Sequence, residues 1–457
     1  MKPNTHKNKT HKNNIKEKTP KPKTQKKKKN SQWKEGVISS FVISKPRVKT
    51  IIRELDNLKK FCIHDEFGVH LPPSNQQNSG RCWLFSYMNI LRLCAISHYK
   101  LPVTFSFSSA YLMFWDKYEK AKYFLQNVST YSSLPADNVE NFIIFRSILS
   151  DGGTWNMLRN LIEKYGVVAY EDMKESSHTI NTDEMNNILI LRLKTFASTL
   201  RKAPQKIHVA MIEREMKRIY RFLCKAVGVP PKKSCVRNFC SNPRTLFLKH
   251  LQTLPGQDLG SMVCLVHVPH LMMNQYYTIP GLSNMKNGHP LLYFNTTMKT
   301  MKDATVSQLT KCQPVWFGSD YGKFNYKDES LLDNTVYDFK NFPYKKDELF
   351  LHKSNAISHY QTNVNHAMML CGYYYKGAKS KSIKYFIVEN SHDAKLKTVS
   401  FENNYGMVVL SNSWFEKYVV MCVVHRDHIR DKTIREKVKD TSHVFDLPKW
   451  CNLGELL

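Results

Sequence analysis

One stretch of this sequence, residues 75–97, constrains both the fold and the chemistry of the chain more than any other. A polar loop containing Gly80 ends at Cys82, and an apolar run follows it to Ser97. Because apolar residues recur there at four- and three-residue steps, the spacing of one helix face, the sequence predicts a helix that begins at Cys82. The residues that set this spacing are Leu84, Met88, Leu91 and Ala95.

Cys82 would lie in the first turn of that helix. There, unpaired backbone N–H groups and the positive end of the helix dipole favour a thiolate over a thiol. Gln76 stands six residues upstream, and its side-chain amide and the Cys82 N–H can form two donors for a developing oxyanion. A nucleophilic cysteine also needs a base. The candidates are His366 and, as its orienting partner, Asn390.

Length and composition narrow the class of protein. The chain has 457 residues, enough for one large domain or two. It contains no apolar run of about 18 residues, so we expect no membrane span. The N-terminus is polar and lysine-rich, without the apolar core of a secretion signal.

The eleven cysteines are scattered without paired spacing. Cys235 and Cys240 form the only close pair, and no second pair of cysteines or histidines completes a zinc site. This pattern predicts free thiols in a reducing compartment, and hence a cytoplasmic location, with no structural metal.

The net charge of +30 is unevenly distributed. Residues 1–30 hold twelve Lys and one Glu, so +11 belongs to this stretch and +19 to the remainder. Residues 1–32 cannot bury enough apolar surface to fold and should form a disordered, solvated tail. Both parts of the chain can bind polyanions, including non-specific nucleic acid.

Along the chain, helical patterns come first and strand patterns later. Helix starts are predicted near residues 105–109 and at Trp155, the second helix ending before Gly166. Residues 182–228 show the spacing of an amphipathic helix with a basic polar side, and we interpret this segment as a helical insertion. Helices followed by strands indicate an α+β protein with antiparallel β-structure in its second half. The short apolar runs are residues 262–266, 314–317, 367–371, 383–388, 407–410 and 418–424.

Residues 75–83, Asn-Gln-Gln-Asn-Ser-Gly-Arg-Cys-Trp, resemble the nucleophile segment of the papain-like cysteine peptidases, and of the bleomycin hydrolase branch in particular. Other segments that resemble this branch occur in its order, from about residue 40 to the C-terminus. They are residues 114–117, 151–157, 163–167, 315–323, 366–368, 388–391 and 416–419.

The resemblance implies a papain-like cysteine peptidase fold, with a helical left half, an antiparallel β-barrel right half and a large helical insertion. The 284 residues from Cys82 to His366 exceed the ~130–150 of simple papain-like enzymes, in agreement with such an insertion. In the family the insertion builds a homohexamer. The expected division is a tail at 1–32, a helical catalytic part at 33–180, the insertion at 181–255, a β-rich half at 256–445 and a C-terminal arm at 446–457.

The resemblance also assigns roles. Cys82 matches the nucleophile, His366 the base, Asn390 the amide that orients the imidazole, and Gln76 the oxyanion donor; no metal or cofactor is implied. The arm of the family lies in the cleft, and its terminal carboxylate, here that of Leu457, pairs with the free α-amine of the substrate. The implied activity is therefore a cysteine aminopeptidase that acts on peptides with a free N-terminus and extends to bleomycin-like amides.

One departure stands beside the site. The family usually has Trp two residues after the orienting Asn, where it shields the His–Asn hydrogen bond, and this chain has His392. Two alternatives stay open: a nucleic-acid-binding protein that keeps the peptidase fold, motivated by the charge, and a catalytically weak homologue, motivated by His392.

Overall fold

The computed structural model describes residues 42–135, 137–146, 148–340, 342–377, 382–392 and 406–454. The predicted tail at 1–32 and Leu457 lie outside the described residues. None of the helices within the described ranges combines the length and the apolar composition needed to cross a bilayer. The helices are α1 Lys45–Asp56, α2 Ile63–Phe67, α3 Cys82–Tyr99, α4 Ser109–Thr130, α5 Val139–Arg146, α6 Trp155–Tyr165, α7 Ser177–Ile180, α8 Asp183–Lys202, α9 His208–Ala226, α10 Pro243–Leu246, α11 Met298–Thr310, α12 Lys346–Leu349, α13 Lys353–Ser358, α14 Asn412–Tyr418 and α15 Lys432–Lys437.

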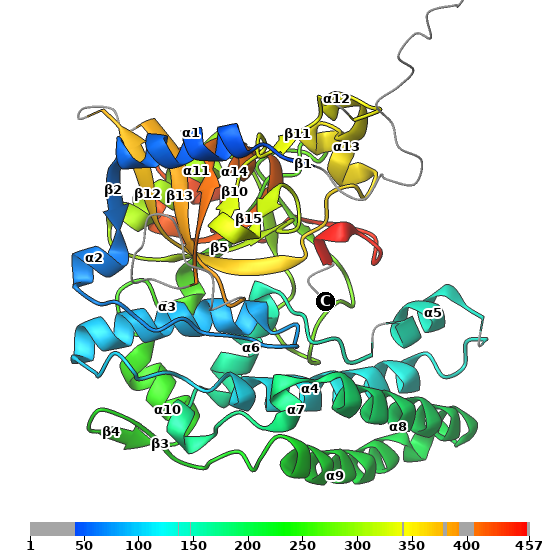
Figure 1. Cartoon of the computed structure of the whole chain (residues 1–457). Helices are drawn as coiled ribbons and strands as arrows, with labels where there is room; N and C mark the ends of the chain where they lie inside the picture. The colour runs from blue at the N-terminus through cyan, green and yellow to red at the C-terminus, as the bar shows by residue number, and fades with distance from the viewer. Residues whose placement is uncertain are drawn as a thin grey trace, which may run out of the picture. The chain divides into compact units, whose positions relative to one another are not determined.

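Helix α3 is the central helix and begins at Cys82, as predicted. It runs between the sheet and helices α4 and α6 (Figure 1). The predicted single apolar face is wrong, because the helix is buried on every side; Trp83, Tyr87 and Leu93 are as buried as Leu84. A helix that is hydrophobic all round belongs in a core.

The other predicted helix starts and stops hold because local capping sets them. The side chain of Ser108 accepts a hydrogen bond from the Tyr111 amide and caps α4. Helix α6 ends at Gly166, which has φ +75°. A Cβ atom at Gly166 would lie 2.0 Å from the Pro243 carbonyl oxygen, so no larger residue fits there.

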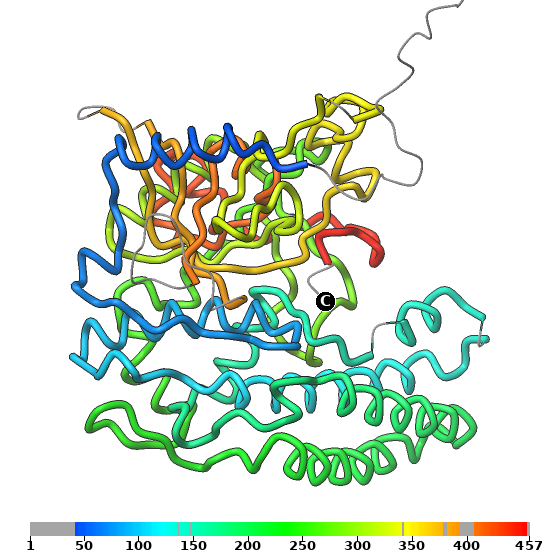
Figure 2. Tube along the Cα trace, in the orientation of Figure 1, coloured from blue at the N-terminus to red at the C-terminus, as the bar shows by residue number. Residues whose placement is uncertain are grey.

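The predicted insertion contains two long helices, α8 and α9, which pack with α4 (Figure 1). Their facing sides are apolar, and Ile212, Met216 and Leu223 of α9 are buried as the spacing predicts. Both helices run along one edge of the molecule in the tube view (Figure 2).

Most strands join one long sheet, in the order β16-β6-β7-β5-β15-β8-β12-β13-β14-β10-β9, with β2 also paired to β12. Its neighbours are antiparallel, as predicted, except for three parallel pairs: β5–β7, β6–β16 and β10–β14. The strands are β1 Val42–Ile43, β2 Lys59–Cys62, β3 Ser234–Val236, β4 Phe239–Ser241, β5 Met262–Val266, β6 Gln275–Thr278, β7 Tyr293–Asn295, β8 Val315–Ser319, β9 Asn325–Tyr326, β10 Leu331–Leu332, β11 Tyr337–Asp338, β12 His366–Lys376, β13 Ser382–Glu389, β14 Met407–Ser411, β15 Val419–His425 and β16 Val444–Asp446.

Of the two N-terminal strands, β2 joins the long sheet, and β1 forms a separate two-stranded sheet with β11. β1 pairs with β11 and β2 with β12, both antiparallel. The sequence order placed residues 33–180 together in the helical part, but backbone hydrogen bonds of residues 42–62 connect them to the β-rich part. Strand β16 spans the boundary expected at 445/446 and pairs with β6.

The prediction of free thiols throughout is wrong at one pair. Strands β3 and β4 form a hairpin that puts Cys235 directly opposite Cys240, and the two sulfurs form a disulfide. A five-residue spacing gives this contact only when a tight turn reverses the chain between the two cysteines. The sequence pattern did not predict that turn. Free thiols are found at Cys62, Cys82, Cys94, Cys224, Cys264, Cys312, Cys371 and Cys422.

Candidate active site

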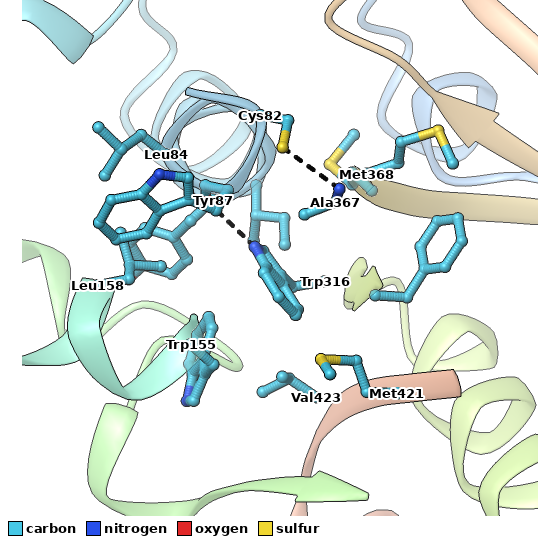
Figure 3. Close-up of a cluster of buried hydrophobic side chains, with 14 of the residues drawn as sticks. Cys82, Leu84, Tyr87, Trp155, Leu158, Trp316, Ala367, Met368, Met421 and Val423 are labelled. Carbon is cyan, nitrogen blue, oxygen red and sulfur yellow. Dashed lines mark hydrogen bonds between the residues drawn. The ribbon is translucent and has the colours of Figure 1, made fainter. Parts of the chain in front are cut away.

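The sulfur of Cys82 meets the start of strand β12. Cys82 is the first residue of α3, and its Sγ accepts a hydrogen bond of 3.4 Å from the Ala367 amide (Figure 3). Ala367 follows His366, the first residue of β12. The fold thus brings together the proposed nucleophile and the backbone of the proposed base, although they are far apart in sequence.

His366 is oriented by Asn390, which follows β13. The two residues share a hydrogen bond of 2.8 Å between His366 Nε2 and Asn390 Oδ1. Because the amide oxygen can only accept, Nε2 carries the proton and Nδ1 is left as the acceptor. The amide nitrogen of Asn390 in turn donates to the Tyr321 hydroxyl at 3.0 Å.

Burial controls the protonation of both reactive groups. It raises the pKa of the Cys82 thiol to about 11. Burial, together with the charge of His392, lowers the pKa of His366 to about 3, although the hydrogen bond that His366 donates to Asn390 acts to raise it. Burial thus disfavours the charged form of both groups, and for Cys82 it acts against the effect of the helix start.

Gln76 is held against the end of β13. Its Oε1 accepts from the Ser391 hydroxyl at 2.7 Å, and its backbone amide donates to the Ser391 carbonyl at 2.9 Å. Its side-chain Nε2 donates one hydrogen to the Ser79 carbonyl at 2.5 Å. An amide nitrogen has two hydrogens, so one remains for an oxyanion.

The loop before Cys82 is clamped by the chain that leads into α8. The buried Arg81 guanidinium donates to the Thr179 carbonyl at 2.7 Å and forms an ion pair with Glu175 at 3.0 Å. Asn78 also donates its amide to the Ile180 carbonyl at 3.0 Å. The loop geometry is therefore set by residues that directly precede the helical insertion.

Asp151 also connects the loop before Cys82 to other elements. It accepts from the Gly80 amide at 3.2 Å and from Asn186 of α8 at 2.9 Å, and it pairs with the buried Lys117 at 2.6 Å. Its carbonyl accepts from the Trp83 indole at 2.8 Å. Burial alone would raise the pKa of Asp151, but Lys117 and the hydrogen bonds hold it well below its usual range.

Sequence reasoning assigned no role to Tyr321, Ser391, Arg81 or Asp151. All four lie within the segments that resemble the family, and this was the only available signal. Their contacts depend on residues that are distant in sequence, so spacing alone does not reveal them. Among the described residues, no group of three or more His, Cys, Asp or Glu side chains is arranged to hold a metal ion.

The C-terminal segment is described as far as Gly454. Its course is fixed by hydrogen bonds from Asn452 to the Ile357 carbonyl at 2.7 Å and from the Tyr293 hydroxyl to the Leu453 carbonyl at 3.2 Å. It forms one wall of a cavity of about 810 Å³. Further walls come from α4, α5, Ser150 and Met157; the segment contributes Lys449, Trp450, Cys451 and Gly454.

Comparison with known proteins shows the family of this chain. A model of the Peptidase C1-like family matches residues 23–454. Aminopeptidase C from Listeria innocua is 31% identical over 402 residues, which cover 84% of this chain and 86% of that protein. Bleomycin hydrolase from Homo sapiens is 28% identical over 407 residues, with the same coverage. The crystal structure of PepW from Lactobacillus rhamnosis HN001 superposes with a TM-score of 0.77 at 27% identity, covering 89% of this chain and 90% of PepW.

Fold and site together define a papain-like cysteine peptidase, which confirms the predicted fold class. The chain belongs to the Peptidase C1-like family and is a hydrolase of that class. Its relatives are named aminopeptidase C, bleomycin hydrolase and aminopeptidase G, which confirms the predicted type of enzyme. The alternatives of a nucleic-acid-binding or catalytically weak homologue are not favoured.

Proposed function

We propose that this chain removes N-terminal residues from peptides, with Cys82 as nucleophile, His366 as base, Asn390 as its orienting partner and Gln76 as oxyanion donor. The observation that carries the proposal is the pair of contacts at the start of β12. The Ala367 amide holds the Cys82 sulfur, and the Asn390 amide oxygen leaves Nδ1 of His366 as the proton acceptor.

The reaction follows from these groups. The thiol proton of Cys82 moves to His366 Nδ1 as the sulfur attacks the peptide carbonyl carbon. The new oxyanion accepts hydrogen bonds from the Cys82 backbone N–H and the free Nε2 hydrogen of Gln76. Collapse breaks the C–N bond, and the imidazolium of His366 gives its proton to the leaving amine. Water, deprotonated by His366, then hydrolyses the thioester and restores the thiol.

We also propose that the Leu457 carboxylate pairs with the free α-amine of the substrate. The fixed course of the segment up to Gly454 supports this role. A carboxylate held in a cleft attracts an ammonium group and excludes acetylated N-termini.

The test compares aminoacyl-coumarin substrates with free and acetylated amines. We expect the intact chain to cleave only the free-amine substrates. Deletion of residues 455–457 should reduce the preference for a free amine by at least ~10-fold, because a charged partner is lost. Leu457→Ala is the matched control, since it keeps the terminal carboxylate and should keep the preference. An unchanged preference in the deletion variant would rule out this role of the C-terminus.

The relatives include bleomycin hydrolases, and we extend the proposed substrates to bleomycin-like amides. The free thiol required at Cys82 suits the cytoplasm, where we place the chain. Non-specific nucleic acid is a further proposed partner, supported by the net charge of +30.

A homohexamer built on the insertion is the proposed assembly. Apolar side chains on α8 and α9 are exposed in the single chain, among them Leu191 at 67% and Val209 at 70%. Buried between subunits, such residues would stabilise an oligomer. Sedimentation equilibrium should give about six times the mass of one chain, and Leu191→Glu with Val209→Glu should lower it. A monomeric wild-type chain at micromolar concentration contradicts the proposal.

A further inference from the structure

Both ends of the Asn390 side-chain amide are held by other residues. His366 Nε2 donates to its Oδ1 at 2.8 Å, and its Nδ2 donates to the Tyr321 hydroxyl at 3.0 Å. Asn390 is buried, with 2% of the residue exposed. Because the oxygen and the nitrogen of this amide are bound to different side chains, the amide cannot rotate out of its plane without weakening both hydrogen bonds.

Tyr321 is itself anchored to the segment that carries the proposed base. Its backbone amide donates to the side-chain oxygen of Asn365 at 3.0 Å, and Asn365 directly precedes His366. The side-chain nitrogen of Asn365 donates to Asp320 at 2.8 Å. Its backbone amide donates to the Ser319 carbonyl at 3.1 Å, beside the pairing of β8 with β12. The turn after β8 is therefore fixed to the residue before His366.

The ring of Tyr321 lies against the imidazole of His366. The two ring centroids are 4.9 Å apart, and the planes are inclined by 44°. One side chain thus packs on the proposed base and, through its hydroxyl, binds the amide that orients the base. His366 begins β12 and Asn390 follows β13. Tyr321 therefore connects the ends of two strands from a third element, the turn after β8.

We propose that Tyr321 is a positioning residue for the proposed Cys82–His366 pair. Its hydroxyl holds the Asn390 amide in the plane in which Oδ1 faces His366 Nε2. This orientation keeps a proton on Nε2 and leaves Nδ1 to accept the proton of Cys82. The inference rests on the proposed roles of Cys82, His366 and Asn390.

The hydroxyl of Tyr321 should affect the chemical steps more than substrate binding. The imidazole of His366 transfers protons both when the thioester forms and when it is hydrolysed, so a loosely held ring lowers kcat. KM should change little, because the hydroxyl acts through Asn390. The effect should also disappear when residue 390 carries no amide, since the hydroxyl then has nothing to orient.

The experiment is a double-mutant cycle on the intact chain with free-amine aminoacyl-coumarin substrates. Tyr321→Phe keeps the ring and removes the hydroxyl, and it should lower kcat by at least ~5-fold while KM stays within about twofold. Asn390→Ala should lower kcat by at least ~10-fold. The variant with both changes should have the kcat of Asn390→Ala within about twofold.

Tyr276→Phe is the matched control. It removes a hydroxyl of β6 that donates to the Val438 carbonyl at 2.7 Å. It should therefore lower the melting temperature but leave kcat within about twofold of wild type. Tyr321→Leu, which removes the ring as well as the hydroxyl, should be at least as slow as Tyr321→Phe.

The outcomes separate this inference from the proposed site. Activity that survives Cys82→Ala overturns the site, and wild-type kcat in Asn390→Ala overturns the orienting role of Asn390 and that of Tyr321 with it. If Cys82 and Asn390 are both required, the role of Tyr321 is overturned by full kcat in Tyr321→Phe. It is equally overturned by a loss that multiplies with that of Asn390→Ala. Circular dichroism checks the fold, and Tyr321→Leu replaces Tyr321→Phe in the cycle if the latter does not fold.

Discussion

Cys82→Ala should abolish hydrolysis of free-amine substrates, with a loss of at least ~10³-fold in kcat, because no other group in the site can form the thioester. The fold should survive, since the change removes one sulfur from the first turn of α3. Initial rates with aminoacyl-coumarin substrates measure the loss, and circular dichroism checks the fold.

Cys94 offers a matched control on the same helix. It is also buried, but its sulfur contacts Gln257 instead of the start of β12. Cys94→Ala should retain kcat within about twofold while lowering the melting temperature slightly, because a small cavity is left. Equal losses in the two variants would mean that the helix, and not the Cys82 thiol, is what matters.

Arg81→Met should weaken both the fold and the catalysis. The variant strands the Glu175 carboxylate and removes the donor to the Thr179 carbonyl, so the loop before Cys82 loses its anchor. Breaking a buried ion pair on one side costs about 3 kcal/mol or more. We expect a lower denaturation midpoint and a fall of at least ~10-fold in kcat, from displacement of the Gln76–Cys82 oxyanion site.

Two further variants distinguish stability from positioning. Arg192→Met breaks the pair with buried Glu215 between α8 and α9 and should lower the midpoint while leaving kcat nearly unchanged. Adding Glu175→Gln to Arg81→Met removes the stranded charge and should recover stability but not kcat. If kcat returns with stability, Arg81 acts only on the fold.

Local patterns predicted the helices well where local contacts decide them. Helix α6 begins and ends as predicted, because Gly166 must adopt a positive φ beside Pro243. The prediction of a single apolar face for α3 was wrong, because a fully buried helix has no solvent-facing side that would require polar residues at regular intervals. The Cys235–Cys240 disulfide was not predicted, because it depends on the register of a hairpin that the five-residue spacing does not determine.

The candidate catalytic residues could be predicted from sequence motifs. The residues that hold them in place could not. Cys82 and His366 were named from flanking residues that resemble the family. The effect of burial on their pKa values could not be predicted from the sequence, because burial is a property of the whole fold and the helix start is a local one. Tyr321 and Asp151 were missed since their partners come from other elements.

The bonds of Asp151 bear on how such an enzyme can be rebuilt. Asp151 contacts Gly80, Lys117 and Asn186, so the start of α8 helps to hold the loop that precedes Cys82. Excision of residues 181–255, to obtain a minimal peptidase, would remove Asn186 and its hydrogen bond to Asp151. Shortening should therefore begin beyond Asn186, with the first turn of α8 retained, and any graft of this insertion into a smaller relative must carry its acceptor aspartate along.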